Sequence, residues 1–334
     1  MNHHRPVVLL GALVAASISG ALIAVQVRIN GQLGAELDDG FLAALISFGV
    51  GTITLTLALA AWGPGRRGFG RVLGALRERR MSPWFLAAGA AGATMVLSQG
   101  LTGAVIGVAL FTVAVVGGQA LGSLLLDRRG VGTMASRPFT APRVAGAVLA
   151  VVAVVWAVSE RIRTDIPWWM LALPFLAGLV TAWQQVANGQ VRERAGSVLT
   201  ATLLSFTGGT IVLLIAAGVH VALAGPPAPL PTSPVLYLGG LLGVAFVAAS
   251  AALIRVTGAL LFGLASVAGQ LLMAVALDLA VPATDAAVPV STIGGAALAL
   301  VAVGVASLRR RTVSAAPDPV SPVPAAPDPV SPTP

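Results

Sequence analysis

The chain has 334 residues, of which 57% are hydrophobic and 10% charged, and its net charge is +8. A soluble chain carries about 25% charged residues, so this composition excludes an ordinary soluble domain and predicts a protein of the lipid bilayer. The chain contains no Cys, which excludes disulfides, thiol catalysis and Cys-ligated metals. All 20 basic residues are Arg, so the chain also lacks the Lys of a Walker-type phosphate loop or a Schiff base. We therefore expect no cofactor, no metal and no ATP-driven pump.

Ten apolar runs approach the roughly 20 residues that a membrane-spanning helix needs. They lie at 7–27, 41–62, 84–103, 104–126, 142–159, 168–187, 199–224, 235–253, 258–281 and 288–308. A cytoplasmic start places 17 of the 20 Arg inside and leaves Arg28, Arg161 and Arg163 outside. This asymmetry predicts that both termini are cytoplasmic. The positive net charge then reflects orientation in the membrane, and no nucleic-acid partner is expected.

The chain contains an internal repeat. Residues 24–55 return at 182–213, with 13 of 32 positions identical and no gap, and residues 89–127 return at 240–278. The two offsets, 158 and 151, differ because the segments between Trp62 and Trp84 and between Ala224 and Tyr237 differ in length, and loops absorb such changes at little cost. Repeats with an odd number of helices insert in opposite senses, as in many secondary transporters. The first apolar run belongs to the repeat, so we expect it to be retained as a helix rather than removed as a signal peptide.

The predicted fold is therefore an all-α polytopic membrane protein with ten transmembrane helices in two inverted-topology five-helix repeats. The first repeat covers residues 1–159 and the second 160–311. Residues 312–334 form a Pro-rich tail that we expect to be disordered and cytoplasmic, with no assigned function. The basic segment 63–83 is predicted as a loop on the anionic headgroups of the inner leaflet.

Polar side chains recur at equivalent positions of the two halves. Gln26 and Asn30 are four residues apart and share a helix face, as do Gln184 and Asn188. Arg28 and Gly31 suggest that the first helix loosens at this point. Other matched polar residues lie within or beside apolar runs, namely Gln119 and Gln270, each after a Gly, and the hydroxyls of Ser47, Thr52, Ser205 and Thr210. Two interpretations stay open: hydrogen bonds that hold helices together, or the lining of a pocket between the repeats.

Charged residues are sparse in the predicted spans. A charge at the middle of a bilayer costs about 2.5–3.5 kcal/mol on insertion scales, so such a residue often marks function. Asp127 and Asp278 end equivalent helices at opposite membrane faces. We expect them to be solvated helix ends, with a proton relay that couples transport as the alternative.

The blocks Ala-x-Gln-x-x-x-Asn-Gly-Gln and Ser-Phe-x-x-Gly-Thr occur in both halves, each followed later by a Gly-Gln pair before an Asp. In these motifs the chain resembles the YdcZ-like inner-membrane exporters of the drug/metabolite transporter superfamily, over nearly its whole length to about residue 308. The resemblance implies an EamA-like fold, a bacterial inner-membrane location and small-molecule export. One departure concerns the small multidrug branch of that superfamily, which uses a carboxylate in its first helix, where this chain has Gln26 and, in the second half, Gln184. Proton antiport by that route is therefore not supported.

We hypothesise a secondary transporter, not an enzyme, that exports a small metabolite or drug-like solute by alternating access. Its partners would be this unidentified solute and the bilayer, and a homo-oligomer stays open. The site would lie near the middle of the membrane between the repeats, lined by Gln26, Asn30, Gln119, Gln184, Asn188 and Gln270. One alternative is a lipid-modifying enzyme or flippase, which should cluster Asp, His or Arg at one membrane face. Another is a structural subunit, which would need no solvated polar site.

Overall fold

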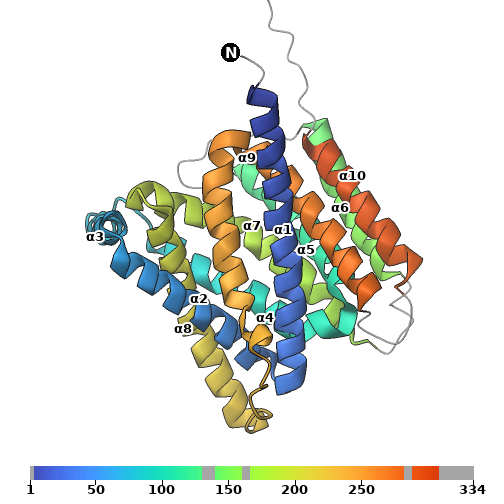
Figure 1. Ribbon diagram of the computed structural model, residues 1–334, viewed down its shortest axis with the longest axis horizontal. Helices are drawn as coiled ribbons and strands as arrows, with labels where there is room; N and C mark the ends of the chain where they lie inside the picture. The colour runs from blue at the N-terminus through green and yellow to red at the C-terminus, as the bar shows by residue number, and fades with distance from the viewer. Residues whose placement is uncertain (1–3, 130–139, 160–165, 282–287, 308–334) are drawn as a thin grey trace, which may run out of the picture.

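The computed structural model describes residues 4–129, 140–159, 166–281 and 288–307, and these form helices and no strand. The Pro-rich tail at 312–334 lies outside the described residues. Figure 1 shows the helices as a bundle in which α1 runs through most of the height. The elements are α1 (His4–Leu37), α2 (Gly40–Ala61), α3 (Gly63–Arg77), η1 (Pro83–Ala87), α4 (Ala88–Ile106), α5 (Val108–Arg129), α6 (Ala141–Val158), α7 (Trp168–Ala195), α8 (Val198–Ala224), η3 (Pro234–Tyr237), α9 (Gly239–Ala280) and α10 (Val290–Ser307).

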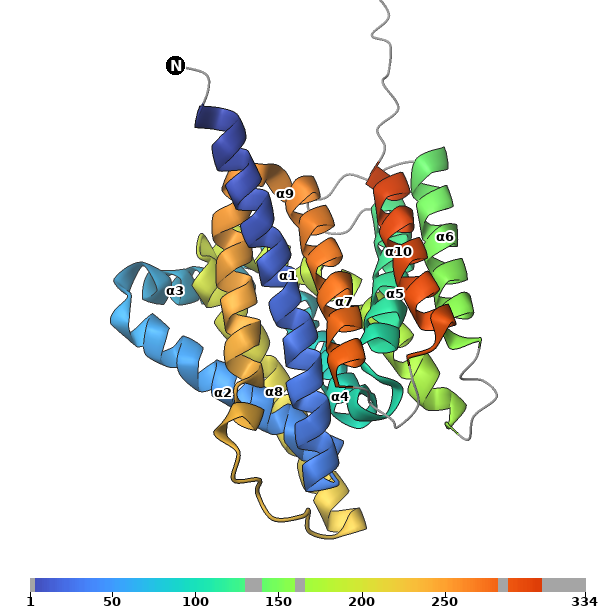
Figure 2. The same cartoon turned by 45° about the vertical axis from the view of Figure 1, so that its right-hand side comes forward.

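Within the described part of the chain, nine helices are long and apolar enough to cross a membrane, and Gly239–Ser250 is a shorter apolar helix. This shorter helix is the start of α9, which has 42 residues and would be about 63 Å long if straight. Figures 1 and 2 show instead that α9 folds back on itself. We call Gly239–Ser250 its first limb and Leu261–Ala280 its second limb. The chain is an all-helical, multi-pass membrane protein, and the limbs correspond to the helices predicted at 235–253 and 258–281.

Two expectations about local structure are wrong. The first helix does not loosen after Asn30: α1 continues to Leu37, ten residues past its predicted end at 27. Gly31 lies within this helix and packs against the backbone of α4, where a Cβ would lie 2.7 Å from the backbone nitrogen of Ala104. Likewise α7 runs to Ala195, eight residues past 187.

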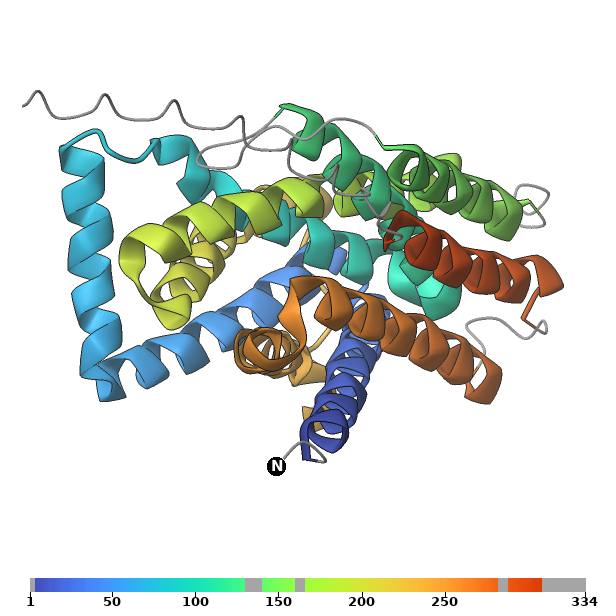
Figure 3. The same ribbon diagram turned by 90° about the horizontal axis from the view of Figure 1, so that it is seen from above.

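The second correction concerns residues 63–83, predicted as a loop. Most of this segment is the helix α3, which has a Pro in its first turn, where proline favours helix initiation. Val72 is buried against the bundle, whereas Arg66, Arg67 and Arg77 are exposed. The segment is therefore an amphipathic helix, and Figure 3 shows it at one edge of the bundle.

Helix contacts recur between the halves at equivalent positions. A Cβ at Gly20 of α1 would collide with the backbone oxygen of Ser266, in the second limb of α9. A Cβ at Gly178 of α7 would collide with the backbone oxygen of Val115, in α5. Positions 20 and 178 differ by 158, and positions 115 and 266 by 151, the two offsets of the sequence repeat. Thus α1 packs on α9 as α7 packs on α5.

A second matched pair links the middle helices. A Cβ at Gly89 of α4 would meet the backbone oxygen of Ser205 in α8, and a Cβ at Gly240 of α9 would meet that of Ser47 in α2. Small residues allow such close approach of transmembrane helices. Both matched pairs are what a pseudo-two-fold relation between the halves predicts.

Two contacts join residues that occupy the same position of the repeat. The Thr52 and Thr210 Oγ1 atoms are 2.8 Å apart, and the Phe48 and Phe206 rings stack with centroids 4.9 Å apart. A residue can contact its own counterpart only near the axis that relates the two halves. Such an axis would therefore pass between α2 and α8.

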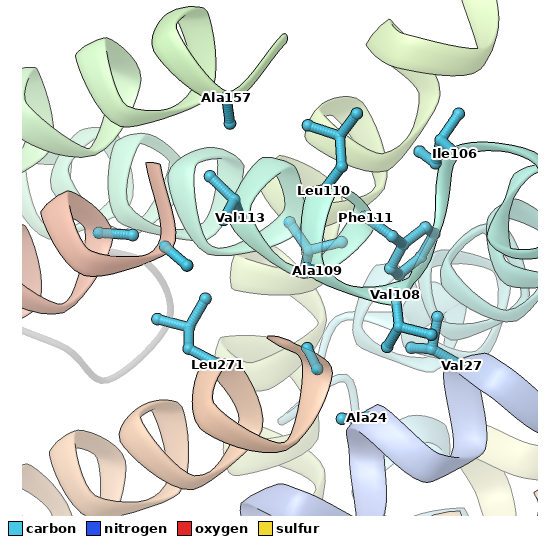
Figure 4. Packing of buried hydrophobic residues seen from close by; sticks show 14 of the residues in the cluster. Ala24, Val27, Ile106, Val108, Ala109, Leu110, Phe111, Val113, Ala157 and Leu271 are labelled. Carbon is cyan, nitrogen blue, oxygen red and sulfur yellow. The ribbon is translucent and has the colours of Figure 1, made fainter. Parts of the chain in front are cut away.

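The largest buried apolar cluster surrounds α5. Figure 4 shows Leu110, Phe111 and Val113 of α5 with Val27 of α1 and Leu271 of α9. On the far side of α5, α6 and α10 lie side by side (Figure 2). The α5 helix thus packs against α1, α9 and the α6–α10 pair. The polar side chains Gln99, Thr52 and Thr210 lie on α4, α2 and α8.

Candidate functional site

Buried amides gather where α1 meets α4. Gln26, Asn30 and Gln99 have 6%, 0% and 1% of their surface exposed, and Asn30 Nδ2 donates a hydrogen bond to Gln99 Oε1 at 2.6 Å. The Asn30 Oδ1 atom and the Ser47 Oγ atom are buried and have no hydrogen-bond partner in the structure. Both atoms lie beside Gly239 at the start of α9. A buried polar atom without a partner costs about 1–3 kcal/mol. A hydrogen-bond donor that reached Asn30 Oδ1 or Ser47 Oγ would therefore be bound favourably.

Gln26 and Gln184 each lie against a glycine of the other half. The Gln26 Nε2 atom would be 3.2 Å from a Cβ at Gly243 in α9, and the Gln184 Nε2 atom lies still closer to Gly92 in α4, where it would collide with a Cβ. Positions 92 and 243 differ by 151, so the two contacts are equivalent. The rings of the Phe48–Phe206 stack also reach these glycines. The structure therefore places the two glutamines symmetrically at the interface between the halves.

The first half holds an amide pair that the second half lacks. The equivalent of Gln99 is Ser250, whose hydroxyl donates to the Val247 carbonyl oxygen at 2.8 Å. Asn188, the equivalent of Asn30, is half-buried, as is Gln184. The repeat did not identify Gln99, because the equivalent residue of the second half is not an amide. An amide inside the apolar run of α4 was the signal that could have found it.

Gln119 and Gln270 do not join these residues. Gly269 lies against Ser17 of α1, nine residues or about 14 Å along the helix from Gln26. Gly118 lies against Phe175 of α7, nine residues from Gln184. The sequence motif repeats at these positions, but the structure separates them from the amide cluster.

Asp278 is buried rather than solvated, which corrects the expectation for a helix end. Only 4% of its surface is exposed, and its carboxylate accepts hydrogen bonds from the backbone N–H groups of Val108 at 2.9 Å and Ala109 at 2.7 Å. These N–H groups have no partner within a helix, because α4 ends before Gly107, which has φ 84°, and α5 begins directly after it. A carboxylate at a helix N-terminus is stabilised by the helix dipole. The side chain of its counterpart Asp127 lies outside the described residues.

Among the described residues, no group of three or more His, Cys, Asp or Glu side chains could hold a metal ion. The named residues of the amide cluster are all uncharged. Their side chains offer neutral hydrogen-bonding groups, and the adjacent rings of Phe48 and Phe206 offer apolar surface.

The family model described as "Putative inner membrane exporter, YdcZ" matches residues 11–156 and 168–306. The chain belongs to this family. Each matched segment of the YdcZ family lies in one half of the chain. No curated protein matches it.

Proposed function

We propose that the chain is a secondary transporter that exports a small solute by alternating access between two inverted five-helix repeats, residues 1–159 and 160–311. Membership of the YdcZ exporter family supports membrane transport. The observation that carries the site is the equivalent placement of Gln26 against Gly243 and Gln184 against Gly92. Transporters with inverted repeats bind their substrates near the middle of the membrane at the repeat interface. Gln26, Asn30, Gln184 and Asn188 are the residues that we assign to this site.

The chemistry of the site favours a polar solute with an apolar part. Amide groups both donate and accept hydrogen bonds, and Asn30 Oδ1 and Ser47 Oγ are acceptors without a partner. A donor group on the solute would satisfy them. The stacked rings of Phe48 and Phe206 would contact an apolar or aromatic part. This combination suits a small metabolite or a drug-like molecule.

One observation favours the alternative of a structural protein. The Asn30–Gln99 bond and the Thr52–Thr210 bond already join helices, and interhelical hydrogen bonds of this kind hold bundles together. Substitution of the matched glutamines distinguishes the two hypotheses. A purely structural role predicts a loss of stability, whereas a binding role predicts a loss of affinity for a solute.

The experiment measures solute binding by thermal shift on the purified protein, followed by counterflow in liposomes for any solute that binds. Gln26→Ala and Gln184→Ala should each weaken binding by roughly tenfold or more, because each leaves a buried group unmatched at about 1–3 kcal/mol. Their stability without ligand should fall little, since interhelical hydrogen bonds average about 0.6 kcal/mol. Gln185→Ala is the control, because Gln185 adjoins Gln184 but is exposed. Variants that unfold easily yet bind as tightly as the wild type would show that the glutamines are structural.

A further inference from the structure

The matched packing of the two halves breaks down at one place. In the first half, glycines of α1 and α2 press on α4: a Cβ at Gly31 would lie 3.1 Å from Gly103 Cα, and a Cβ at Gly100 would lie 2.7 Å from the Gly40 carbonyl oxygen. Gly34 lies against the backbone of Gly100 in the same way. These backbone contacts close the space between α1, α2 and α4 beyond Asn30.

In the second half, the equivalent glycine of α7 makes no such contact with the described residues. Gly189, the counterpart of Gly31, has no described atom within 4 Å of a Cβ placed on it, and Gly189 and Asn188 are half-buried, whereas Gly31 and Asn30 are buried. The counterpart of Gly34 is Arg192, which is exposed. An arginine cannot make the backbone contact that a glycine makes. Among the described residues, α7 and α9 share no packing comparable to that of α1 on α4.

Elsewhere the glycine contacts of Gly20 and Gly178, and those of Gly89 and Gly240, are matched between the halves. The closed end is covered by the loop after α8, where Ala228 N donates to the Leu37 carbonyl oxygen at 3.0 Å. The other end lies by α3, where Arg71 Nη1 donates to the Ala195 carbonyl oxygen at 3.1 Å. Leu37 and Ala195 are themselves equivalent positions. In Figure 2, α1 ends near the bottom of the bundle, whereas α3 lies at its left edge, well above that end.

We infer that the glycine contact of α1 and α2 with α4 is the seal of the transport site, and that the α7 face carrying Gln184, Asn188 and Arg192 is its entrance. These three side chains follow one another at intervals of four residues, so they lie on one helix face. The site is then closed where α1 and α2 pack on α4, and α7 is left without comparable packing on the described part of α9 at the other end. The open end is the one that the arginine distribution predicts to be cytoplasmic, as entry of an exported solute requires. The inference rests on the proposed function for its meaning, but its test needs no substrate.

The test uses the absence of native Cys. Asn30→Cys and Asn188→Cys place one thiol at each of two equivalent positions, and both replace a side chain by a smaller one. In purified protein in detergent, where a polar maleimide reaches both ends, Asn188→Cys should react at least roughly tenfold faster, because a buried thiol reacts only after local opening. Equal rates, or a faster reaction of Asn30→Cys, would overturn the inference.

The seal itself is tested by Gly103→Val in the Asn30→Cys background. Any Cβ at Gly103 would lie 3.2 Å from the Val27 carbonyl oxygen and 3.3 Å from Gly31 Cα, so the branched side chain should separate α1 from α4 and make the thiol reactive. Gly49→Val is the matched control, since nothing lies within 4 Å of a Cβ at this glycine of α2. Where Gly103→Val folds poorly, Gly103→Ala makes the same test with a smaller side chain. Continued protection of the thiol in a folded Gly103 variant would refute the seal.

The two proposals fail in different ways. Labelling that follows the expected pattern while Gln26→Ala and Gln184→Ala leave solute binding unchanged would keep the seal and remove the glutamine site. Loss of solute binding with equal labelling of both thiols would do the reverse.

Discussion

Asp278 ties the second half of the chain to the first, because its carboxylate caps α5 from the second limb of α9. Replacing it by Ala removes both hydrogen-bond acceptors from the N–H groups of Val108 and Ala109, which lie 2.9 and 2.7 Å from the carboxylate oxygens. Loss of a helix N-cap costs about 0.5–2 kcal/mol, and a buried N–H without a partner costs about 1–3 kcal/mol. These ranges describe overlapping effects, so we expect Asp278→Ala to lower the free energy of unfolding by about 2–4 kcal/mol.

Asp278→Asn separates capping from proton coupling. Asn is as good an N-cap as Asp, but it offers one oxygen where the carboxylate offers two. Its stability should therefore lie between those of the wild type and Asp278→Ala. If the carboxylate only caps α5, transport by Asp278→Asn should continue and keep its dependence on any proton gradient. A proton relay would instead predict a stable protein whose transport no longer responds to that gradient.

The assay compares thermal midpoints of purified protein with transport in liposomes. Asp39→Ala is a matched control, because Asp39 caps α2 through the N–H groups of Phe41 and Leu42 at 2.8 and 2.9 Å. The two hydrogen bonds of that cap stay within α2, so their loss should cost the ordinary N-cap value of about 0.5–2 kcal/mol, in addition to the contact of Asp39 Oδ1 with His220 Nε2 of α8 at 4.0 Å. An Asp278→Ala protein as stable as the wild type would refute the capping argument.

Two further predictions concern the axis and the orientation. Thr52→Val and Thr210→Val should each lower the free energy of unfolding by about 0.6 kcal/mol. The double variant should lose little more than either single variant, because both substitutions remove the same 2.8 Å contact. Additive losses in thermal stability would contradict this prediction. Gly70, Asp38 and Thr232 are exposed. A single cysteine at position 70 should be labelled from the cytoplasm, and single cysteines at positions 38 and 232 should be labelled from outside. Labelling of Asp38→Cys and Gly70→Cys from one side would contradict the predicted topology.

The apolar runs predicted helix limits well where local chemistry ends the helix. The prediction of 41–62 matches Gly40–Ala61, because Asp39 caps α2 at its start, and 199–224 matches Val198–Ala224, which Ser197 caps. The ends of α1 and α7 were missed because Gly31 and the exposed Gln32 resemble a helix end in sequence. Neither glycine ends its helix: Gly31 packs against α4, and α7 continues past Gly189 although no described atom lies within 4 Å of a Cβ placed there.

The same distinction applies to the polar residues. The sequence repeat identified Gln26 and Gln184 as equivalent residues. Because both lie near the axis that relates the two halves, both reach the interface between the halves. Gln119 and Gln270 are equivalent too, but the glycines beside them contact α7 and α1 nine residues away from Gln184 and Gln26, because a repeat predicts correspondence and not proximity. Asp278 was expected to be solvated because it is close to a helix end. Its burial depends on the break at Gly107, where another helix begins.

Glycine substitutions test whether the halves share a frame and differ only at the seal. Gly20 and Gly178 meet equivalent backbone atoms, so Gly20→Ala and Gly178→Ala should lower the thermal midpoint by similar amounts. Gly31 and Gly189 are equally equivalent in sequence, but a Cβ at Gly31 would lie 2.7 Å from the Ala104 nitrogen and one at Gly189 would meet nothing described. Gly31→Ala should therefore destabilise, whereas Gly189→Ala should be neutral or gain up to about 1 kcal/mol from the higher helix propensity of Ala. If α7 closes on α9 during the cycle, Gly189→Ala should also slow transport without loss of stability. Equal destabilisation by Gly31→Ala and Gly189→Ala would mean that both ends are packed alike, and the asymmetry on which the entrance rests would be gone.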